Sequence, residues 1–175
     1  MNKTIALGLL FSLPLQVVAY HSQRCKNPIE HVQITAFDYD KDINQVMKIV
    51  EQTKKWTFRG WSEEKIQSFF KNKAPQIKVA KINNKIAGYI VQRISDFMED
   101  LKEVYVRFIA VSKKYRKKGI GKKLLYNTIK TSTKKYRRIH LCVFKNNKNA
   151  LAFYKKIGFK KIFESPSIIE LHIEI

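Results

Sequence analysis

A basic, glycine-containing turn between an apolar strand pattern and an amphipathic segment constrains this chain more than any other stretch. Residues 104–111 are an apolar run, and the turn after them contains Arg116-Lys117-Lys118-Gly119-Ile120-Gly121. The segment that follows has apolar residues at helical spacing. We therefore expect the turn at the N-terminus of a helix, where backbone N–H groups and the helix dipole favour an anion. The two glycines allow close approach of the backbone to a ligand.

The spacing of these glycines excludes two common phosphate-binding loops. The turn lacks the Gly-x-x-x-x-Gly-Lys-Ser/Thr pattern of a P-loop, and Leu124 stands where a dinucleotide fingerprint needs a third glycine. A Gly-x-Gly turn among lysines is also found as an ordinary connection between a strand and a helix. The local pattern leaves both interpretations open.

Composition narrows the class of protein but not its partner. The chain has 175 residues, 45% of them apolar, which indicates one domain with a short additional segment. Its formal charge of +21 attracts nucleic acid, anionic membranes or acidic small molecules, although the lysines are scattered as in any lysine-rich protein. The two cysteines, Cys25 and Cys142, and the four dispersed histidines lack metal-ligand spacing, so we expect no metal site.

Residues 1–19 differ from everything after them. Lys3 gives a short positive start, residues 4–19 are almost wholly apolar or small, and Val17-Val18-Ala19 suits a signal peptidase. The pattern predicts a secretory signal peptide, followed by a polar connector over residues 20–30. An uncleaved anchor and a start codon annotated too early stay open. A cleaved leader predicts export to the periplasm or the medium and no membrane span in the mature form, whereas a later start predicts a cytoplasmic protein.

Apolar periodicity predicts the element order βααβββαβαββ. We expect helices to begin after caps at Asp40, Ser62 and Asn146 or Asn147, and at Gly119, and strands over residues 31–37, 76–82, 86–94, 103–111, 138–144, 159–163 and 168–173. The order predicts an α/β fold (α+β mixed sheet), with a central mixed sheet and helices on both faces.

Three local signals refine this prediction. Asn83-Asn84 between apolar runs predicts a hairpin, since Asn tolerates positive φ. Gly88 inside a strand predicts a bulge or a close backbone approach. Along the fourth strand, alternation predicts that Glu103, Tyr105, Arg107 and Ile109 share one face and Val104, Val106, Phe108 and Ala110 the other.

A second informative stretch is Asn147-Lys148-Asn149-Ala150-Leu151-Ala152-Phe153-Tyr154-Lys155-Lys156-Ile157-Gly158-Phe159. On a helix, Asn147 and Tyr154 are two turns apart and can face one groove. Asn147 is then either a ligand contact or a helix cap, and Tyr154 either a proton donor or a core aromatic residue.

Together the two stretches resemble the signatures of the GNAT superfamily of N-acetyltransferases. The first, Arg116-x-x-Gly119-x-Gly121 preceded by Ile109-Ala110-Val111, resembles that family's acetyl-CoA pyrophosphate loop. The second, Asn147-x-x-Ala150-x-x-Phe153-Tyr154-x-x-x-Gly158-Phe159, resembles its other signature motif. The resemblance covers roughly residues 31–175 and implies a GNAT N-acetyltransferase domain there.

The resemblance also implies roles for individual residues. Backbone groups of Ile109 and Val111 are expected to pair with the pantetheine arm, Asn147 to contact that arm, and Tyr154 to protonate the departing CoA thiolate. The pyrophosphate is expected on the N–H groups of the turn, formed by Arg116, Lys117, Lys118, Gly119, Ile120, Gly121 and Lys122. The thioester carbonyl is expected where the fourth and fifth strands splay apart.

The general base is the least defined role. Some family members carry Glu five residues before the motif Asn, where this chain has Cys142, and others carry a carboxylate on the fourth strand, where it has Tyr105. Glu103 is our candidate base, and its alternative role is an exposed glutamate at the start of the strand, paired with a lysine. Proton removal through water and backbone carbonyls requires no carboxylate.

The resemblance thus predicts transfer of an acetyl group from acetyl-CoA, without a metal, to a primary amine of a small molecule, peptide or protein. One alternative is a catalytically weak, basic module that binds nucleic acid or the ribosome, and we do not favour it. Another is an exported effector acetyltransferase. A homodimer stays open.

Overall fold

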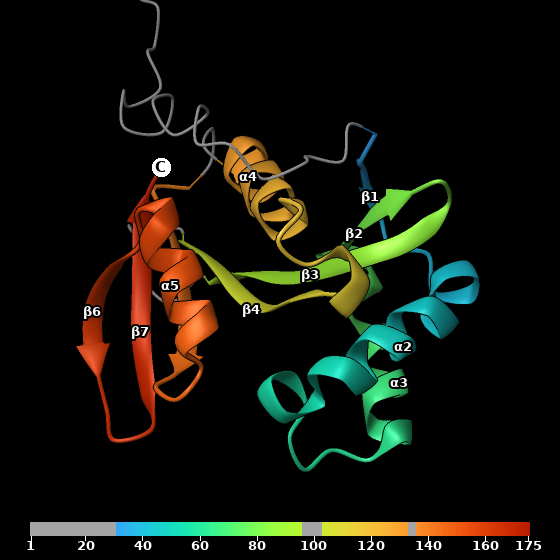
Figure 1. The fold of residues 1–175 in the computed structure, drawn as a ribbon, viewed down its shortest axis with the longest axis horizontal. Coiled ribbons are helices and arrows are strands. Elements are labelled where there is room, and N and C mark those ends of the chain that lie inside the picture. The colour runs from blue at the N-terminus through green and yellow to red at the C-terminus, as the bar shows by residue number, and fades with distance from the viewer. Residues whose placement is uncertain (1–30, 96–102, 133–135) are drawn as a thin grey trace, which may run out of the picture.

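A mixed sheet of seven strands organises the molecule (Figure 1). The computed structural model describes residues 31–95, 103–132 and 136–175. The expected signal peptide and the connector over residues 20–30 lie outside them, as do residues 96–102 and 133–135. Among the described residues, no helix combines the length and apolar character needed to cross a membrane.

The element order predicted from the sequence is confirmed. The strands are β1 (Gln33–Ala36), β2 (Ile77–Ile82), β3 (Lys85–Ser95), β4 (Glu103–Val111), β5 (Arg138–Phe144), β6 (Lys160–Glu164) and β7 (Ile168–Glu174). The helices are α2 (Tyr39–Thr57), α3 (Glu63–Asn72), α4 (Ile120–Ser132) and α5 (Lys148–Ile157), with short 3₁₀ turns η2 (Ala74–Gln76) and η3 (Lys113–Tyr115). The strands lie in the order β1-β2-β3-β4-β5-β7-β6, and within the described ranges only β4 and β5 pair in parallel.

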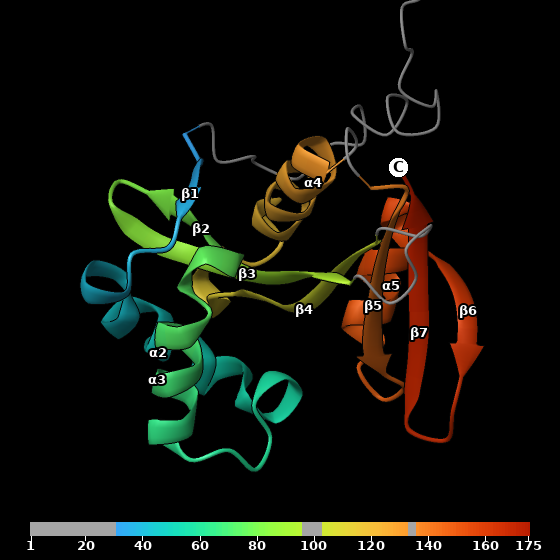
Figure 2. The same ribbon diagram turned by 180° about the vertical axis from the view of Figure 1, so that it is seen from behind.

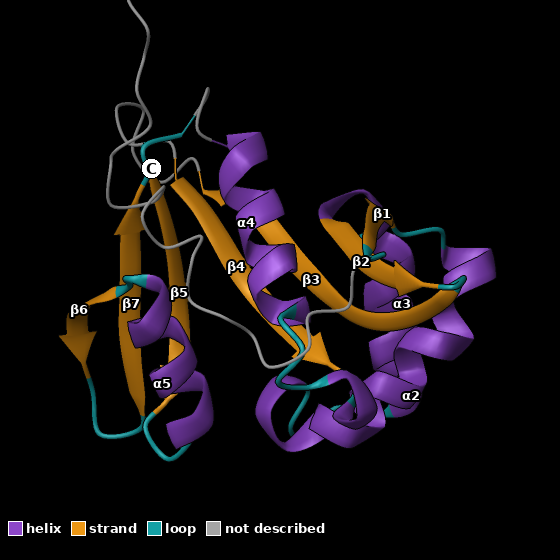
Figure 3. Ribbon diagram, turned by 45° about the horizontal axis from the view of Figure 1, so that its top comes forward, coloured by secondary structure: helices purple, strands orange, loops and turns teal. Residues whose placement is uncertain are grey.

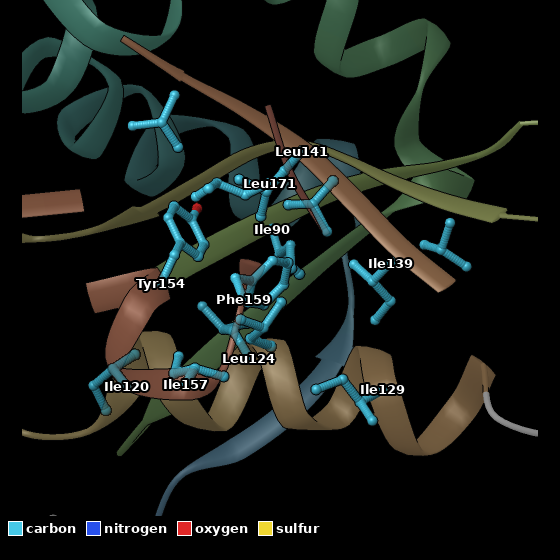
Figure 4. Packing of buried hydrophobic residues seen from close by; sticks show 14 of the residues in the cluster. Ile90, Ile120, Leu124, Ile129, Ile139, Leu141, Tyr154, Ile157, Phe159 and Leu171 are labelled. Atoms are coloured by element: carbon cyan, nitrogen blue, oxygen red, sulfur yellow. The ribbon is translucent and has the colours of Figure 1, made fainter. Parts of the chain in front are cut away.

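Helices cover both faces of the sheet, as predicted (Figures 1 and 3). On one face, α2 and α3 pack through residues such as Val46, Ile49 and Phe70, which we call the α2/α3 cluster. On the other face, α4 and α5 pack through Leu124, Tyr154 and their neighbours, which we call the α4/α5 cluster and Figure 4 shows from close by. Two separate apolar clusters therefore hold the sheet from its two sides.

Local signals explain where most elements begin and end. Asn83 and Asn84 have φ of 48° and 60°, so they form the predicted hairpin turn between β2 and β3. Ser62 caps α3 as predicted, and Gly158, with φ of 103°, ends α5 in the left-handed conformation. The cap predicted at Asp40 is wrong. Asp38 caps α2 by accepting from the Lys41 N–H, and Asp40 lies in the first turn, where the helix dipole also favours a carboxylate.

Gly88 marks the predicted close approach of two backbones, here β3 and β4. A Cβ atom added at Gly88 would lie 2.7 Å from the carbonyl oxygen of Ala110. This oxygen belongs to the neighbouring strand, so it cannot move without disturbing the ladder. The glycine therefore allows β4 to lie against β3 just before the turn that begins at Ser112.

We expect Gly88→Ala to lower the free energy of unfolding by about 2–3 kcal/mol, because the added methyl group overpacks backbone against backbone. Urea denaturation of the two proteins measures this difference. Lys85→Ala, at an exposed position of the same strand, is the control and should change stability by less than about 0.5 kcal/mol. Equal stability of Gly88→Ala and the parent protein would contradict the close approach.

Candidate active site

Strands β4 and β5 pair only at their first three residues and then separate (Figure 3). The last pair is Tyr105 with His140, whereas β4 continues to Val111 and β5 to Phe144. Among the described residues, no strand pairs with the β5-facing edge of β4 beyond Tyr105. Backbone groups on that edge are therefore available to an extended ligand, and the splay predicted between the fourth and fifth strands is present.

Hydrogen bonds define which backbone groups face the splay. The Ser112 N–H donates to the Ala87 carbonyl of β3 at 2.9 Å. The Val111 carbonyl shares that peptide unit and so points the opposite way, where it accepts from Nε of Arg116 at 3.1 Å. Because strand residues alternate, the backbone groups of Ile109 point in the same direction as those of Val111. Ile109 and Val111 thus present polar groups to the splay, and Arg116 takes one lone pair of Val111.

A β-bulge at Arg107 interrupts β4. Val91 pairs with Phe108 and Gln92 with Val106, so Arg107 is an extra residue on β4. Such a residue shifts the alternation of the strand. The predicted alternation therefore holds on each side of the bulge but is wrong across it. Val104 and Val106 pack with Ile109 and Val111 in the α4/α5 cluster, whereas Phe108 and Ala110 pack in the α2/α3 cluster.

The bulge also directs the side chain of Arg107 toward α3. Its guanidinium lies 4.9 Å from the ring centre of Phe69 and 5.5 Å from that of Phe108. Cation–π contacts of this kind hold an arginine in one orientation while it stays exposed to solvent. Arg107 therefore adds a positive charge to the α2/α3 side of the splay.

The basic turn connects β4 to α4 through two left-handed residues. Lys117 has φ of 59° and Gly119 has φ of 82°, and α4 begins at Ile120. The first N–H groups of a helix have no acceptor within the helix, so those of Ile120 and Gly121 face outward at its N-terminus. The side chains of Arg116, Lys117 and Lys118 are exposed around them. The turn thus combines backbone donors with three cations, as the sequence predicted.

Gln52 of α2 supports this turn from the other side of the sheet. Its Oε1 accepts from the Lys113 N–H at 2.7 Å and from the Ser112 hydroxyl at 3.4 Å. One side chain from a distant helix therefore fixes the start of η3. The sequence carries no signal for this contact, because Gln52 belongs to the polar positions of an amphipathic helix.

Gly121 lies where α4, α5 and the end of β4 meet. A Cβ atom there would lie 3.3 Å from Cζ of Phe153 and 3.7 Å from Cγ2 of Val111. The contact brings the glycine turn of the first motif against the helix of the second. The two motifs that lie apart in the sequence are therefore in contact.

Asn147 is the N-cap of α5. Its Oδ1 accepts from the Ala150 N–H at 3.2 Å, and the residue is half-buried. The capping role proposed as one alternative is thus present, and it uses the oxygen of the amide. The Nδ2 group is a donor that the cap does not use, so the predicted contact with the CoA arm stays a prediction.

We expect Asn147→Ala to lower the free energy of unfolding by about 1 kcal/mol, because α5 loses its cap. Asn147→Ser keeps a capping oxygen but removes the amide donor, so its stability should stay close to that of the parent protein. If Nδ2 contacts the cofactor arm, both variants bind acetyl-CoA more weakly. Thermal melts and calorimetric titration separate the two roles, and unchanged affinity in both variants would leave Asn147 as a cap alone.

Tyr154 is buried in the α4/α5 cluster, and its hydroxyl points from α5 toward the strands (Figure 4). Its ring packs edge-on against Phe153 and Phe159. Burial raises the pKa of the Tyr154 phenol, because the phenolate would lose its hydration. The hydroxyl is therefore fully protonated at neutral pH, as a proton donor must be.

Glu103 lies at the opposite end of β4 from the basic turn. Its carboxylate is half-buried and accepts from the Arg138 guanidinium at 3.0 Å, so Glu103 has an ion-pair partner, but an arginine instead of the lysine expected for an exposed glutamate. Six residues of strand, about 20 Å, separate it from Ile109. The structure does not bring Glu103 to the turn, and its role as base stays a prediction.

Polar side chains that the sequence did not single out as a group lie where β4 and β5 separate. The rings of Tyr105 and His140 are 5.4 Å apart, and Cys142 follows two residues along β5. Burial and hydrogen bonding with Cys142 raise the pKa of Tyr105 to about 12, so its hydroxyl is also protonated at neutral pH. Strand periodicity is the signal that places His140 and Cys142 on one face.

Comparison with known proteins places these features in a family. The acetyltransferase (GNAT) family model matches residues 43–159. An N-alpha-acetyltransferase of Saccharolobus solfataricus is 36% identical over 93 residues, which cover 48% of this chain and 56% of that protein. The chain thus spans little more than half the length of such curated relatives.

Solved structures agree in fold. Naa50 of Arabidopsis thaliana, in complex with the bisubstrate analogue CoA-Ac-MVNAL, has a TM-score of 0.65 at 23% identity, covering 82% of this chain and 99% of that one. The PaiA N-acetyltransferase of Thermoplasma acidophilum, in complex with coenzyme A, has a TM-score of 0.64 at 22% identity, covering 83% and 99%. At these identities the likeness concerns the fold. Since the family model matches well over half of the sequence and the structure joins both motifs beside the splayed strands, the chain belongs to the GNAT family of acetyltransferases.

Proposed function

We propose that this protein transfers an acetyl group from acetyl-CoA to the α-amino group of a polypeptide. The use of acetyl-CoA is supported above all by the unpaired edge of β4, where Ile109 and Val111 present backbone groups to the splay. The basic turn connects this edge to the N-terminus of α4. The choice of acceptor is supported by the 36% identity with an N-alpha-acetyltransferase over 93 residues.

The residues of the site suit the parts of acetyl-CoA. The amide-containing pantetheine arm needs donors and acceptors in an extended row, which the backbones of Ile109 and Val111 supply. The pyrophosphate needs N–H groups and cations, which the turn from Arg116 to Lys122 supplies. Gly121 keeps the meeting point of α4, α5 and β4 clear of a side chain, and the Asn147 amide lies at the start of the neighbouring helix.

Acetyl-CoA supplies an activated thioester, and the side chains of this protein donate a proton to the leaving sulfur and accept one from the attacking amine. Tyr154 approaches the splay from the α5 side and donates its phenolic proton to the leaving sulfur. An acceptor amine approaches from the α2/α3 side, where the neutral Tyr105 hydroxyl can accept a hydrogen bond from it. Its excess proton leaves through Glu103 or through a chain of water molecules and backbone carbonyls.

An acceptor panel tests the proposal. The full chain is incubated with acetyl-CoA and peptides that carry a free α-amine, the same peptides with a blocked α-amine and a free lysine, or a polyamine. We expect thiol release and a mass increase at the N-terminus of the unblocked peptides only. Acetylation of lysine or of the polyamine would contradict the α-amine as acceptor and identify another primary amine in its place. Salt-sensitive RNA binding without any thiol release would favour the binding module instead.

The leader enters the proposal separately. Residues 1–19 retain the pattern of a signal peptide, and an exported effector would meet acetyl-CoA inside a host cell. The mass of the native N-terminus tests this point. A chain that begins at Tyr20 supports export, and a chain that retains residues 1–19 contradicts cleavage.

A further inference from the structure

Three metal-ligating side chains gather on the two strands beyond the splay. His140 and Cys142 are two residues apart on β5, and Glu170 on β7 is the direct cross-strand partner of Cys142. We call these three residues the β5–β7 cluster. Figure 2 shows the two strands side by side. Ile139 and Leu141, which alternate with His140 and Cys142 along β5, are buried in the α4/α5 cluster, so the β5–β7 cluster lies on the opposite face.

The distances in the β5–β7 cluster suit a small metal ion. One ligand atom from each of the three residues lies within 4.8 Å of the others. Nε2 of His140 is 3.5 Å from Oε2 of Glu170. A tetrahedral zinc ion with bonds of about 2.0–2.1 Å holds a nitrogen and an oxygen ligand about 3.4 Å apart. The sulfur has further to move, and rotation of the Cys142 side chain supplies that movement.

The state of the His140 ring independently favours a ligand. Its Nε2 atom is buried and has no hydrogen-bond partner among residues 31–95, 103–132 and 136–175. A buried polar atom without a partner costs about 1–3 kcal/mol. The Glu170 carboxylate lies 3.5 Å away, and it forms no hydrogen bond with this nitrogen. A cation between the two groups would satisfy both.

We propose that the β5–β7 cluster binds one zinc ion or a similar transition-metal ion. Imidazole, thiolate and carboxylate together select zinc or cobalt rather than magnesium or calcium, which prefer oxygen ligands alone. His140 binds through its neutral Nε2, Cys142 through its thiolate, whose proton passes to the solvent, and Glu170 through a carboxylate oxygen. Three protein ligands leave the fourth tetrahedral position to water.

The location of this ion gives it an effect on acetyl transfer, a consequence that rests on the proposed function. His140 packs against Tyr105, the last residue of β4 that pairs with β5. An ion bound to His140 therefore lies beside the entrance to the splay on the α2/α3 side. Zinc is expected to inhibit acetyl transfer in competition with the amine acceptor and not with acetyl-CoA.

Binding is tested first, without any measurement of activity. Cobalt is added to the full-length, reduced protein, and the absorption of the thiolate–cobalt bond is recorded, followed by displacement with zinc. We expect one ion per chain. Cys142→Ser should abolish the thiolate band, and Glu170→Gln should weaken binding by roughly tenfold or more.

Two matched controls use the other ligand residues of the chain. Cys25→Ser removes the second cysteine, and His31→Ala removes a surface histidine on another part of the fold. Both should bind cobalt as the parent protein does. Circular dichroism without metal checks that each variant is folded. If Cys142→Ser is unfolded, the weaker binding expected for Glu170→Gln tests the site in its place. A thiolate band that survives in Cys142→Ser, or that is lost in Cys25→Ser, would overturn the site.

Activity separates this proposal from the proposed function. Cobalt binding with acetyl transfer that zinc does not inhibit would keep the site and refute its effect on the acceptor. Cobalt binding without acetyl transfer to any amine would keep the site and refute the proposed function. Active enzyme that binds no cobalt would refute the site alone.

Discussion

Gly119→Val should bind acetyl-CoA at least about tenfold more weakly than the parent protein, since the turn can no longer hold its conformation. Gly119 has φ of 82°, where a residue with a side chain costs about 1–2 kcal/mol and a β-branched residue more. The turn is expected to relieve this strain by moving, which displaces the N–H groups at the start of α4. Isothermal titration with acetyl-CoA at constant salt measures the loss.

Gly121→Leu tests the same turn by a different physical route. Gly121 carries no positive φ, but its Cβ position already lies 3.3 Å from the Phe153 ring. A leucine there must push α5 away or occupy the space beside Val111, so we expect weaker acetyl-CoA binding again. The two variants share a location and differ in mechanism, which makes agreement between them informative.

Gly60→Val is the matched control for Gly119→Val. Gly60 has φ of 76°, and a Cβ atom there meets nothing within 4 Å. Gly60→Val therefore introduces the same kind of backbone strain as Gly119→Val, but outside the proposed acetyl-CoA site. It should lower the melting temperature and leave acetyl-CoA affinity unchanged. Parent-like affinity in both Gly119→Val and Gly121→Leu would show that the anion binds elsewhere.

The parts of the fold that the sequence predicted well depend on local chemistry. The hairpin at Asn83 and Asn84, the cap at Ser62 and the helix end at Gly158 each require a particular residue type at one position. The basic turn is of the same kind, because a left-handed Gly119 and a helix N-terminus follow from a few neighbouring residues. Such signals do not depend on contacts with distant parts of the chain.

The parts that the sequence did not predict depend on how distant strands meet. The bulge at Arg107 exists because β3 and β4 slip by one residue between Val91 and Gln92, and a regular alternation hides it. The β5–β7 cluster needs the register that places Cys142 opposite Glu170. Gln52 reaches the turn only because α2 crosses the sheet beneath it. Register and crossing are tertiary properties, so a one-dimensional pattern does not contain them.

Tyr154→Phe should lower kcat by roughly a hundredfold while acetyl-CoA affinity and KM for the acceptor stay near the parent values. The ring of Tyr154 lies in the α4/α5 cluster and keeps its contacts with Phe153 and Phe159 when the hydroxyl is removed. The loss therefore concerns the proton alone, which the leaving sulfur would otherwise receive. Steady-state rates and titration calorimetry on the same preparation separate turnover from binding.

Tyr89→Phe is the control for the loss of a buried tyrosine hydroxyl. Tyr89 is fully buried in the α2/α3 cluster, away from the splay, so its variant should turn over at the parent rate.

The pH dependence of kcat gives a second test of Tyr154. Burial raises the pKa of Tyr154, so the phenol keeps its proton as the pH rises past the ordinary tyrosine pKa of about 10. The parent kcat should therefore show no alkaline loss due to this group below about pH 10. A Tyr154→Phe enzyme with full kcat would remove Tyr154 from the reaction and leave solvent as the proton donor.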